Sequence, residues 1–207
     1  MRFLLIDDHV VVRSGLKLIL SDLYKPCIID EAEDGESALI KLKLHFYDLI
    51  ILDIKMPNTN TFTLMEYIRN NYPNLKVLVF SMNSESIYAK RFLNAGARGF
   101  INKVAPLDEI IKAINIILNG KRYISETLLE VLAELGGDLK KENSFDALSP
   151  REFEIVSMLL AGDGISQIAQ RLNLQVSTVG THKARIFEKL KVGNLLELKE
   201  LANSFNI

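Results

Sequence analysis

Five short apolar runs alternate with longer segments of helical periodicity over roughly the first 120 residues, and this alternation is the strongest constraint on the fold. The runs are four to six residues long and rich in branched side chains, as buried strands are. They are RFLLI (2–6), CIIDEA (27–32), LIIL (49–52), KVLVFS (76–81) and GFIN (99–102). Such an order predicts a parallel sheet, buried on both sides under helices.

Apolar residues recur at i, i+3 and i+4 between these runs, which is the pattern of amphipathic helices. The segments are 11–23, 37–44, 63–68, 86–93 and 107–118. We therefore expect residues 1–121 to form one α/β domain with a doubly wound, five-stranded parallel sheet.

The remainder of the chain has a different texture. Residues 148–207 hold helical patterns without a strand-like run, which predicts a small four-helix domain. Ser149 and Glu152 have the spacing of a capping box around Pro150, so a helix begins there and runs to Ala161. Further helices are expected over 166–172, 177–190 and 194–205.

Residues 122–147 are typical of a connection between two domains. We expect a helix over about 125–135, followed by the linker sequence GGDLKKENSFDA at 136–147. Residues 124–147 contain 2 basic and 6 acidic side chains, whereas residues 148–207 contain 7 basic and 6 acidic ones. The barely basic end of the chain is only weak support for a nucleic-acid partner.

Charged and hydroxyl side chains follow the ends of four predicted strands. They are Asp7, Asp8, Asp53, Ser81 and Lys103. Ligands of a doubly wound sheet bind beyond the carboxyl ends of the strands, where these groups would converge. A carboxylate nucleophile, further carboxylates for a cation and two groups that hold phosphate oxygens together predict phosphoryl transfer.

The charge at this edge requires a cation. Two carboxylates about 5 Å apart repel by roughly 3 kcal/mol at an effective dielectric of about 20. An incoming phosphoryl group would add about −1.5 to −2 charge, which Lys103 alone cannot balance. A hard divalent cation with oxygen ligands offsets this charge, so we expect Mg²⁺ as the cofactor.

The stretches LLIDDH, LIILDIKMP, VLVFS and GARGFINK resemble the receiver domain of bacterial response regulators, and LSPREFEIVSMLLAGDGISQIAQRLNLQVSTVGTHKARIFEKL resembles the LuxR-type helix-turn-helix of the NarL/FixJ subfamily. The resemblance implies a flavodoxin-like receiver followed by a DNA-binding domain. It also implies a cytoplasmic transcription regulator without membrane association, phosphorylated by a histidine kinase, rather than an enzyme with a turned-over substrate. The single cysteine, Cys27, agrees with a reducing compartment.

The resemblance also implies a role for each pocket residue. Asp53 would accept the phosphoryl group, and Lys103 and Ser81 would bind it. Phe100 would follow the Ser81 hydroxyl inward as the switch residue. The implied Mg²⁺ ligands are Asp8, Asp53 and the Lys55 carbonyl, with Asp7 acting through water.

The loop MPNTNTF departs from the family pattern, because Asn58 and Thr61 stand where glycines are common. The backbone there must avoid positive φ or tolerate strain. Lys55 lies where the family controls access of hydrolytic water, and the sign of its effect is open.

The helix over 177–190 is the predicted recognition helix. Winding it at 100° per residue places Val179, Ile186 and Leu190 on the packed face, with His182 partly buried beside them. The residues expected to contact DNA are Gln167, Ser177, Thr178, Gly180, Thr181, Lys183, Ala184, Arg185 and Lys189. Gly180 either lets the backbone approach the DNA closely or reflects relaxed specificity.

So few cations predict weak binding by one copy, and therefore a homodimer on palindromic promoter DNA. The apolar stripe of Leu195, Leu198, Leu201 and Ala202 is either its interface or core. Two other functions remain. One is an atypical regulator that binds DNA without phosphorylation, which the intact acidic pocket disfavours and the altered loop MPNTNTF slightly favours. A phosphatase with Asp53 as nucleophile is disfavoured, because Lys55 stands where an acid is needed.

Overall fold

The computed structural model describes residues 1–57, 59–126, 128–129, 144–172 and 174–205. The chain divides into two compact units, residues 1–136 and 137–207, and each is considered by itself. No helix in the described ranges combines the length and apolar character of a membrane span.

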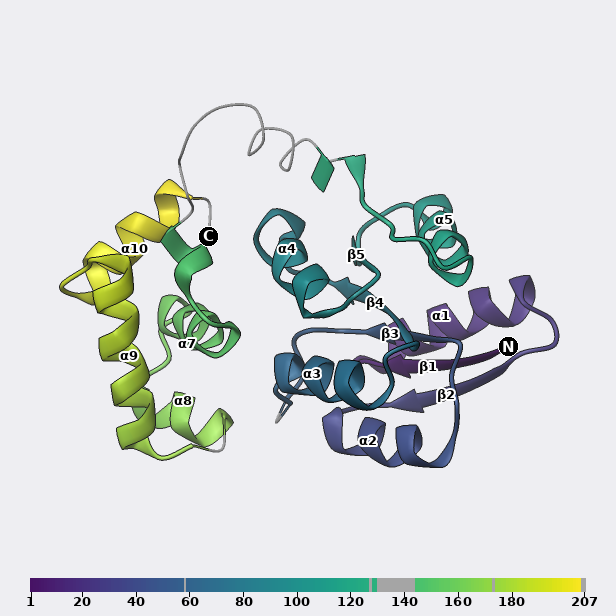
Figure 1. Ribbon diagram of the computed structural model, residues 1–207, viewed down its shortest axis with the longest axis horizontal. Helices are drawn as coiled ribbons and strands as arrows, with labels where there is room; N and C mark the ends of the chain where they lie inside the picture. The colour runs from purple at the N-terminus through teal and green to yellow at the C-terminus, as the bar shows by residue number, and fades with distance from the viewer. Residues whose placement is uncertain (58, 127, 130–143, 173, 206–207) are drawn as a thin grey trace. The chain divides into compact units, whose positions relative to one another are not determined.

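The first unit is an α/β fold (Figure 1). Its described strands are β1 (Arg2–Ile6), β2 (Ile28–Ala32), β3 (Leu49–Leu52), β4 (Lys76–Ser81) and β5 (Gly99–Asn102). The helices between and after them are α1 (Val10–Leu23), α2 (Gly35–Leu44), α3 (Thr61–Asn71), α4 (Glu85–Ala95) and α5 (Leu107–Leu118). All five strands and all five helices predicted from periodicity are confirmed, with differences only at element ends.

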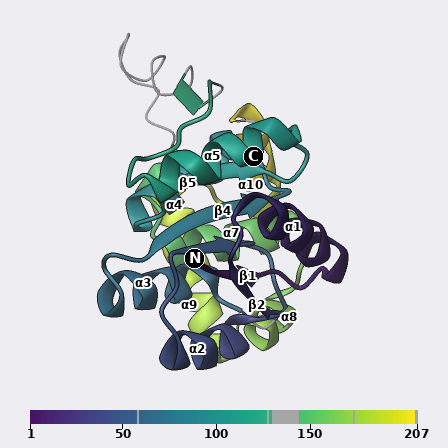
Figure 2. The same cartoon turned by 90° about the vertical axis from the view of Figure 1, so that its right-hand side faces the viewer.

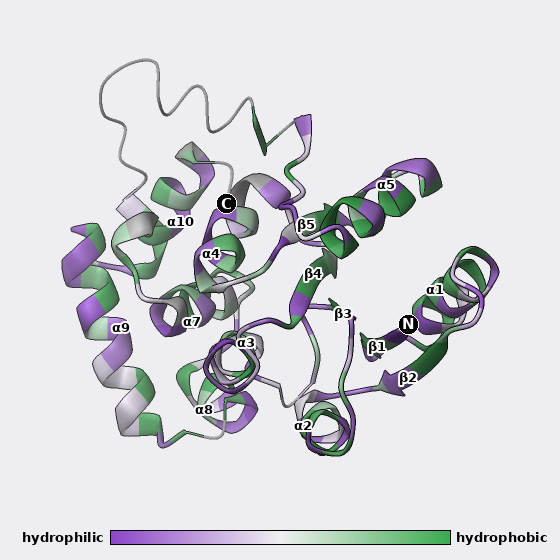
Figure 3. Ribbon diagram, turned by 45° about the vertical axis from the view of Figure 1, so that its right-hand side comes forward, coloured by the Kyte–Doolittle hydropathy of each residue, from purple (hydrophilic) through white to green (hydrophobic). Residues whose placement is uncertain are grey.

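The sheet is parallel throughout, in the order β2-β1-β3-β4-β5. Alternate strand residues point to opposite faces, so each face has its own core. One core packs α2, α3 and α4 on side chains such as Ile50 and Val79, and the other packs α1 and α5 on side chains such as Ile51 and Leu78. Figure 2 shows the helices on both sides of the strands, and Figure 3 shows β4 as largely hydrophobic.

One strand differs from the predicted double burial. β2 is an edge strand, and Ile28 is 55% exposed there, whereas every residue of β3 is buried. The other outermost strand, β5, is buried from Gly99 to Ile101, so the two edges of the sheet differ.

The second unit contains η1 (Ser144–Ala147), α7 (Pro150–Leu160), α8 (Ile165–Arg171), α9 (Val176–Leu190) and α10 (Leu195–Ser204). The capping box at Ser149 and Glu152 is present as predicted. At the start of α10, the Asn194 side chain accepts from the Glu197 N–H, and the Glu197 carboxylate accepts from the N–H of Gly193.

Both described ends of the predicted connection are packed, which the sequence did not reveal. Tyr123 and Leu128 are buried in the first unit, and Phe145 and Leu148 are buried in the second. Residues 130–143, which include most of the predicted helix at 125–135 and most of the predicted linker, lie outside the described residues.

Candidate functional site

The predicted pocket lies where the strand order reverses, between β1 and β3. Ile6 and Leu52 are register partners at the ends of these strands, so Asp7 and Asp53 follow them side by side. The N–H of Asp53 donates to the Ile6 carbonyl at 2.8 Å. Both acids are buried, with relative exposures of 3% and 4%. The sheet register therefore brings two carboxylates together, as expected for ligand-binding ends of parallel strands.

Lys103 joins the two acids. Its Nζ lies 2.6 Å from Asp7 Oδ2 and 2.7 Å from Asp53 Oδ2, and its side chain is only 6% exposed. Burial lowers the pKa of Lys103, but the hydrogen bonds and charges of Asp53 and Asp7 outweigh burial and raise it overall. Lys103 is thus a permanent ammonium ion placed between the carboxylates.

The second oxygen of Asp53 is oriented by backbone. Oδ1 accepts from the N–H of Ile54 at 2.7 Å and from the N–H of Lys55 at 3.4 Å. The Lys55 side chain itself is exposed. Backbone donors on one oxygen and an ammonium on the other compensate for the removal of this carboxylate from water.

Asp8 and His9 complete the acidic edge. Ligand atoms of Asp7, Asp8, His9 and Asp53 all lie within 4.8 Å of one another. His9 Nδ1 is 2.8 Å from Asp8 Oδ1, yet the angles do not make a hydrogen bond, and this buried oxygen has no donor among the described residues. A buried carboxylate oxygen without a donor, next to two other carboxylates, fits a hard divalent cation such as Mg²⁺.

Ser81 and Phe100 lie at the next strand ends. Ser81 is 1% exposed, and its carbonyl accepts from the N–H of Lys103 at 3.0 Å, which ties the ends of β4 and β5 together. Within the part of the chain that the structure describes, the Ser81 hydroxyl accepts only a long contact of 3.5 Å from the N–H of Asn83. Phe100 is fully buried in the core under α3 and α4. Both residues predicted to respond to a phosphoryl group are therefore buried at this edge.

The departure in the loop after β3 has a physical explanation at Thr61. Within the described ranges, Lys191 is the one non-glycine residue with positive φ, so Thr61 avoids the left-handed region. It starts α3 instead, and its Oγ1 donates to the Ile54 carbonyl at 2.9 Å. The expected effect of Asn58 falls outside the described residues.

Arg13 is a residue that sequence reasoning missed. It is 9% exposed, its Nη1 donates to the Asp7 carbonyl at 2.6 Å, and its Nε donates to Glu31 at 3.1 Å. Lys17 shares Glu31 at 2.8 Å. Arg13 thus holds the backbone of the acidic edge from behind. A signal was present, because Arg13 lies on the inward side of its helix with Leu16 and Leu20, where an unpaired cation is costly.

The second unit places the predicted recognition helix, α9, on α7 and α8. Val179, Ile186 and Leu190 are buried, and His182 is half-buried, as the helical wheel predicted. The outward residues are Ser177, Thr181, Ala184, Arg185 and Glu188. Figure 3 shows pale, weakly polar ribbon over the first half of α9 and purple, hydrophilic segments over its second half. An added Cβ at Gly180 would meet nothing within 4 Å, so packing does not require glycine there.

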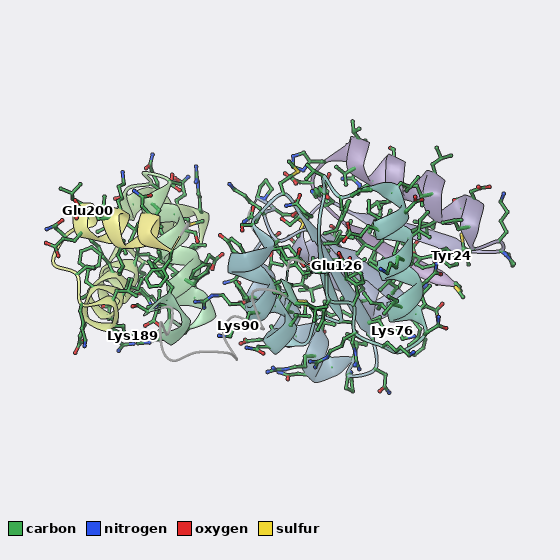
Figure 4. All side chains as sticks on the ribbon, turned by 90° about the horizontal axis from the view of Figure 1, so that it is seen from above. Tyr24, Lys76, Lys90, Glu126, Lys189 and Glu200 are labelled. Atoms are coloured by element: carbon green, nitrogen blue, oxygen red, sulfur yellow. The ribbon has the colours of Figure 1, made fainter. Side chains whose placement is uncertain are left out.

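The side chains of four predicted DNA contacts have partners among the described residues of the unit, and in one of them the Thr181 Oγ1 donates to the Ser177 carbonyl at 3.0 Å. Lys189 Nζ lies 2.6 Å from Glu152 Oε2, the same oxygen that accepts from the Ser149 N–H (Lys189 is labelled in Figure 4). Lys183 Nζ lies 5.2 Å above the Phe187 ring. The Gln167 side chain accepts from the Gly164 N–H and caps α8. The unit therefore uses these polar groups partly for its own packing.

The apolar stripe of α10 is divided between core and surface. Leu198 and Ala202 are 0% and 1% exposed, whereas Leu195 is 37% exposed. The two buried residues settle that part of the stripe as core.

Comparisons with known proteins agree with both units. The response regulator receiver domain matches residues 3–115, and the luxR family of bacterial regulatory proteins matches residues 146–202. The response regulator GacA of Pseudomonas protegens is 33% identical over 201 residues, which cover 97% of this chain and 94% of GacA. The response regulator UvrY of Escherichia coli K12 is 30% identical over 200 residues, which cover 96% and 92%.

Solved structures show the same architecture. RcsB from Salmonella enterica serovar Typhimurium, bound to promoter P1flhDC in the presence of the phosphomimetic BeF3-, has a TM-score of 0.76 and 26% identity, covering 99% of this chain and 98% of RcsB. The response regulator ChrA of a heme-sensing two-component system has a TM-score of 0.51 and 30% identity, covering 99% and 97%. The chain therefore belongs to the response regulators that join a receiver domain to a LuxR-type DNA-binding domain, which are phosphorylation-regulated transcription regulators.

Proposed function

We propose that this response regulator is phosphorylated on Asp53 by a histidine kinase, with Mg²⁺ bound at Asp7, Asp8 and Asp53, and that phosphorylation favours a homodimer on promoter DNA. The observation that carries the proposal is the buried ion-pair group in which Lys103 contacts both Asp7 and Asp53, beside an Asp8 oxygen that has no hydrogen-bond donor among the described residues.

The chemistry follows from these contacts. An Asp53 oxygen would form the new P–O bond while the P–N bond to the phosphohistidine breaks, and the departing imidazole would take up a proton. Bound Mg²⁺ would offset the charge of the phosphoryl oxygens and orient them. The Lys103 ammonium, paired with Asp53 Oδ2, is placed to pair with a phosphoryl oxygen instead. The buried Ser81 hydroxyl, which has only one long contact, is free to donate to another.

On the DNA side, we propose that α9 enters the major groove, with Gly180, Thr181 and Ala184 facing the bases and Ser177 and Thr178 at the phosphates. Arg185 and Lys183 would contact phosphates. RcsB is described as bound to promoter DNA with the phosphomimetic present, which supports the same order of events here. We also propose residues 1–121, 122–147 and 148–207 as receiver, connection and DNA-binding domain, acting in the cytoplasm.

The test uses the full chain with Mg²⁺ and beryllofluoride, and measures mass by analytical ultracentrifugation and affinity for a DNA fragment selected in vitro. Wild type should dimerise and bind DNA more tightly on addition of beryllofluoride. Asp53→Asn should show neither change, because the neutral amide cannot coordinate beryllium as the carboxylate does. A wild-type chain that binds DNA equally with and without beryllofluoride would instead be a phosphorylation-independent regulator.

A further inference from the structure

The segment that leaves the receiver toward the second unit is fixed to three elements of the first unit. We call residues 123–129, apart from the undescribed residue 127, the docked segment. Ile124 and Leu128 pack on the core under α4, and Tyr123 packs on the opposite core. The neighbouring Glu126 is labelled in Figure 4. Leu128 is 1% exposed, so the segment is part of the folded unit.

Gly99 at the start of β5 makes room for this docking. An added Cβ there would lie 3.1 Å from the Cβ of Tyr123 and 2.9 Å from an Ile117 side-chain carbon. The N–H of Tyr123 donates to the Arg98 carbonyl at 2.8 Å, and the Tyr123 hydroxyl donates to Glu109 at 2.6 Å. The docked segment is thus held by β5 and α5 through Tyr123.

A polar contact attaches the docked segment to the first turn of α4, beside the apolar packing of Leu128. The Ser125 hydroxyl donates to Glu85 Oε1 at 2.7 Å, and the same Ser125 oxygen accepts from the N–H of Leu128 at 3.0 Å. Ser125 is 6% exposed. Glu85 is in the first turn of α4, four residues after Ser81. One hydrogen bond therefore connects the strand end at the phosphorylation pocket to the start of the interdomain connection.

From this geometry we propose that the Ser125–Glu85 hydrogen bond is a latch, which holds the docked segment in the unphosphorylated chain and opens when Ser81 moves toward the phosphoryl group on Asp53. The proposal rests on the proposed function. Movement of Ser81 would pull the short loop at residues 82–84 and displace the first turn of α4. The docked segment would then lose its hydrogen bond to α4, while Tyr123 keeps its attachment to β5 and α5.

The energetics of Glu85 suit a contact that opens. Burial raises the pKa of Glu85, the Ser125 hydroxyl lowers it part of the way, and the negative charge of Glu109 raises it again, so that the pKa is raised overall. The carboxylate is therefore poorly compensated where it lies, and it regains hydration when it separates from Ser125. A strongly paired residue would resist such a change.

Hydrogen exchange of the full chain, followed by mass spectrometry with and without Mg²⁺ and beryllofluoride, tests the latch. In wild type, beryllofluoride should raise the exchange rate over residues 123–129 by about tenfold, as expected for loss of one hydrogen bond to a charged group. Glu85→Ala should show the raised rate already without beryllofluoride, and no further rise with it. Ser125→Ala should also show the raised rate without beryllofluoride, and a higher one than Glu85→Ala, because the N–H of Leu128 loses its acceptor as well.

Two variants serve as controls. Glu85→Gln keeps an acceptor for the Ser125 hydroxyl and should retain the beryllofluoride response. Tyr123→Phe removes a hydrogen bond of similar length to α5 instead of α4, and should also retain it. Thermal unfolding confirms that each variant is folded.

The hydrogen exchange of the pocket distinguishes failure of the latch from failure of the proposed function. If exchange around Asp53 and Ser81 responds to beryllofluoride while residues 123–129 do not, the latch is overturned and the proposed function stands. If Glu85→Ala exchanges like wild type in both conditions, the latch is also overturned. If the pocket does not respond either, the proposed function fails and the latch fails with it.

Discussion

The acidic pocket and the DNA-reading surface use charge in opposite ways. In the pocket, opposite charges are buried against one another, and Lys103 contacts Asp7 and Asp53 within 2.7 Å. On α9 the outward face is exposed and weakly charged, and the cation near its end, Lys189, is paired with Glu152. A pocket for one phosphoryl group needs fixed geometry, whereas a surface for DNA needs cations that are free to meet phosphates. Few such cations remain, which favours paired copies.

The largest effect is expected from removal of Arg13, which helps to fix the geometry of the acidic pocket. In Arg13→Met the Asp7 carbonyl loses its 2.6 Å donor, and we expect Mg²⁺ affinity to fall by about tenfold or more, as for other residues that orient ligands from behind. The charge of Arg13 is offset by Glu31, so the loss of position should dominate over the loss of repulsion toward the metal. Isothermal titration calorimetry is suitable, because the chain has no tryptophan to report binding by fluorescence.

The control is Lys17→Met, which removes the other cation on Glu31 without contacting Asp7. It should leave Mg²⁺ affinity close to that of wild type. Equal or tighter Mg²⁺ binding by Arg13→Met would show that charge, not position, is the contribution of Arg13.

Glu152 is a buried carboxylate of the second unit that is paired with a lysine, as Asp7 and Asp53 are in the pocket. Burial raises its pKa, but the hydrogen bonds of Lys189 and Ser149 outweigh burial and hold the pKa below its usual 4.5. Folding thus favours the ionised form of Glu152. Its contribution to the stability of the unit is complete above pH 4.5 and is lost as the pH falls through the lowered pKa. We expect protection of α9 amides to fall below pH 4.5 in wild type.

In Glu152→Gln this pH dependence should be weaker. The free energy of opening of the α9 amides at neutral pH should be lower by about 1–2 kcal/mol. Hydrogen exchange resolves the two units, which tyrosine fluorescence cannot do, since all six tyrosines precede residue 124. An identical acid transition in the variant would mean that Glu152 carries no such linkage.

Arg185 and Lys189 differ in their freedom to meet DNA, although both are cations of α9. Arg185→Gln should make the dependence of log affinity on log salt concentration shallower by about 0.9, the value for one phosphate contact. Lys189→Gln should leave this slope unchanged, because its ammonium is held by Glu152. Affinities for one selected DNA fragment at several salt concentrations decide between them. Equal slope changes would restore Lys189 as a phosphate contact.

The smallest effect is expected at Gly180. Since an added Cβ meets nothing within 4 Å, Gly180→Ala should stabilise α9 by about 1 kcal/mol through helix propensity. Thermal unfolding together with DNA affinity separates the two interpretations of this glycine. A stabilised variant with weakened binding indicates close approach of the backbone to DNA, and a stabilised variant with unchanged binding indicates relaxed specificity.

The sequence by itself determined the elements and the pocket. Strand runs and helical spacing are local, and the carboxyl ends of parallel strands must share one edge, so Asp7, Asp53, Ser81 and Lys103 could be brought together before any coordinates were known. The capping box at Ser149 was equally local, because its two members are three residues apart.

Tertiary structure alone decided which partners distant residues take. Arg13 meets the backbone of Asp7, Lys189 meets Glu152 across 37 positions, and Ser125 meets Glu85 across 40. Periodicity assigns a side chain to a face but does not say which side chain lies opposite, since that depends on how helices pack. Arg185 and Lys189 are both exposed cations of α9, and only the fold shows that Lys189 meets Glu152.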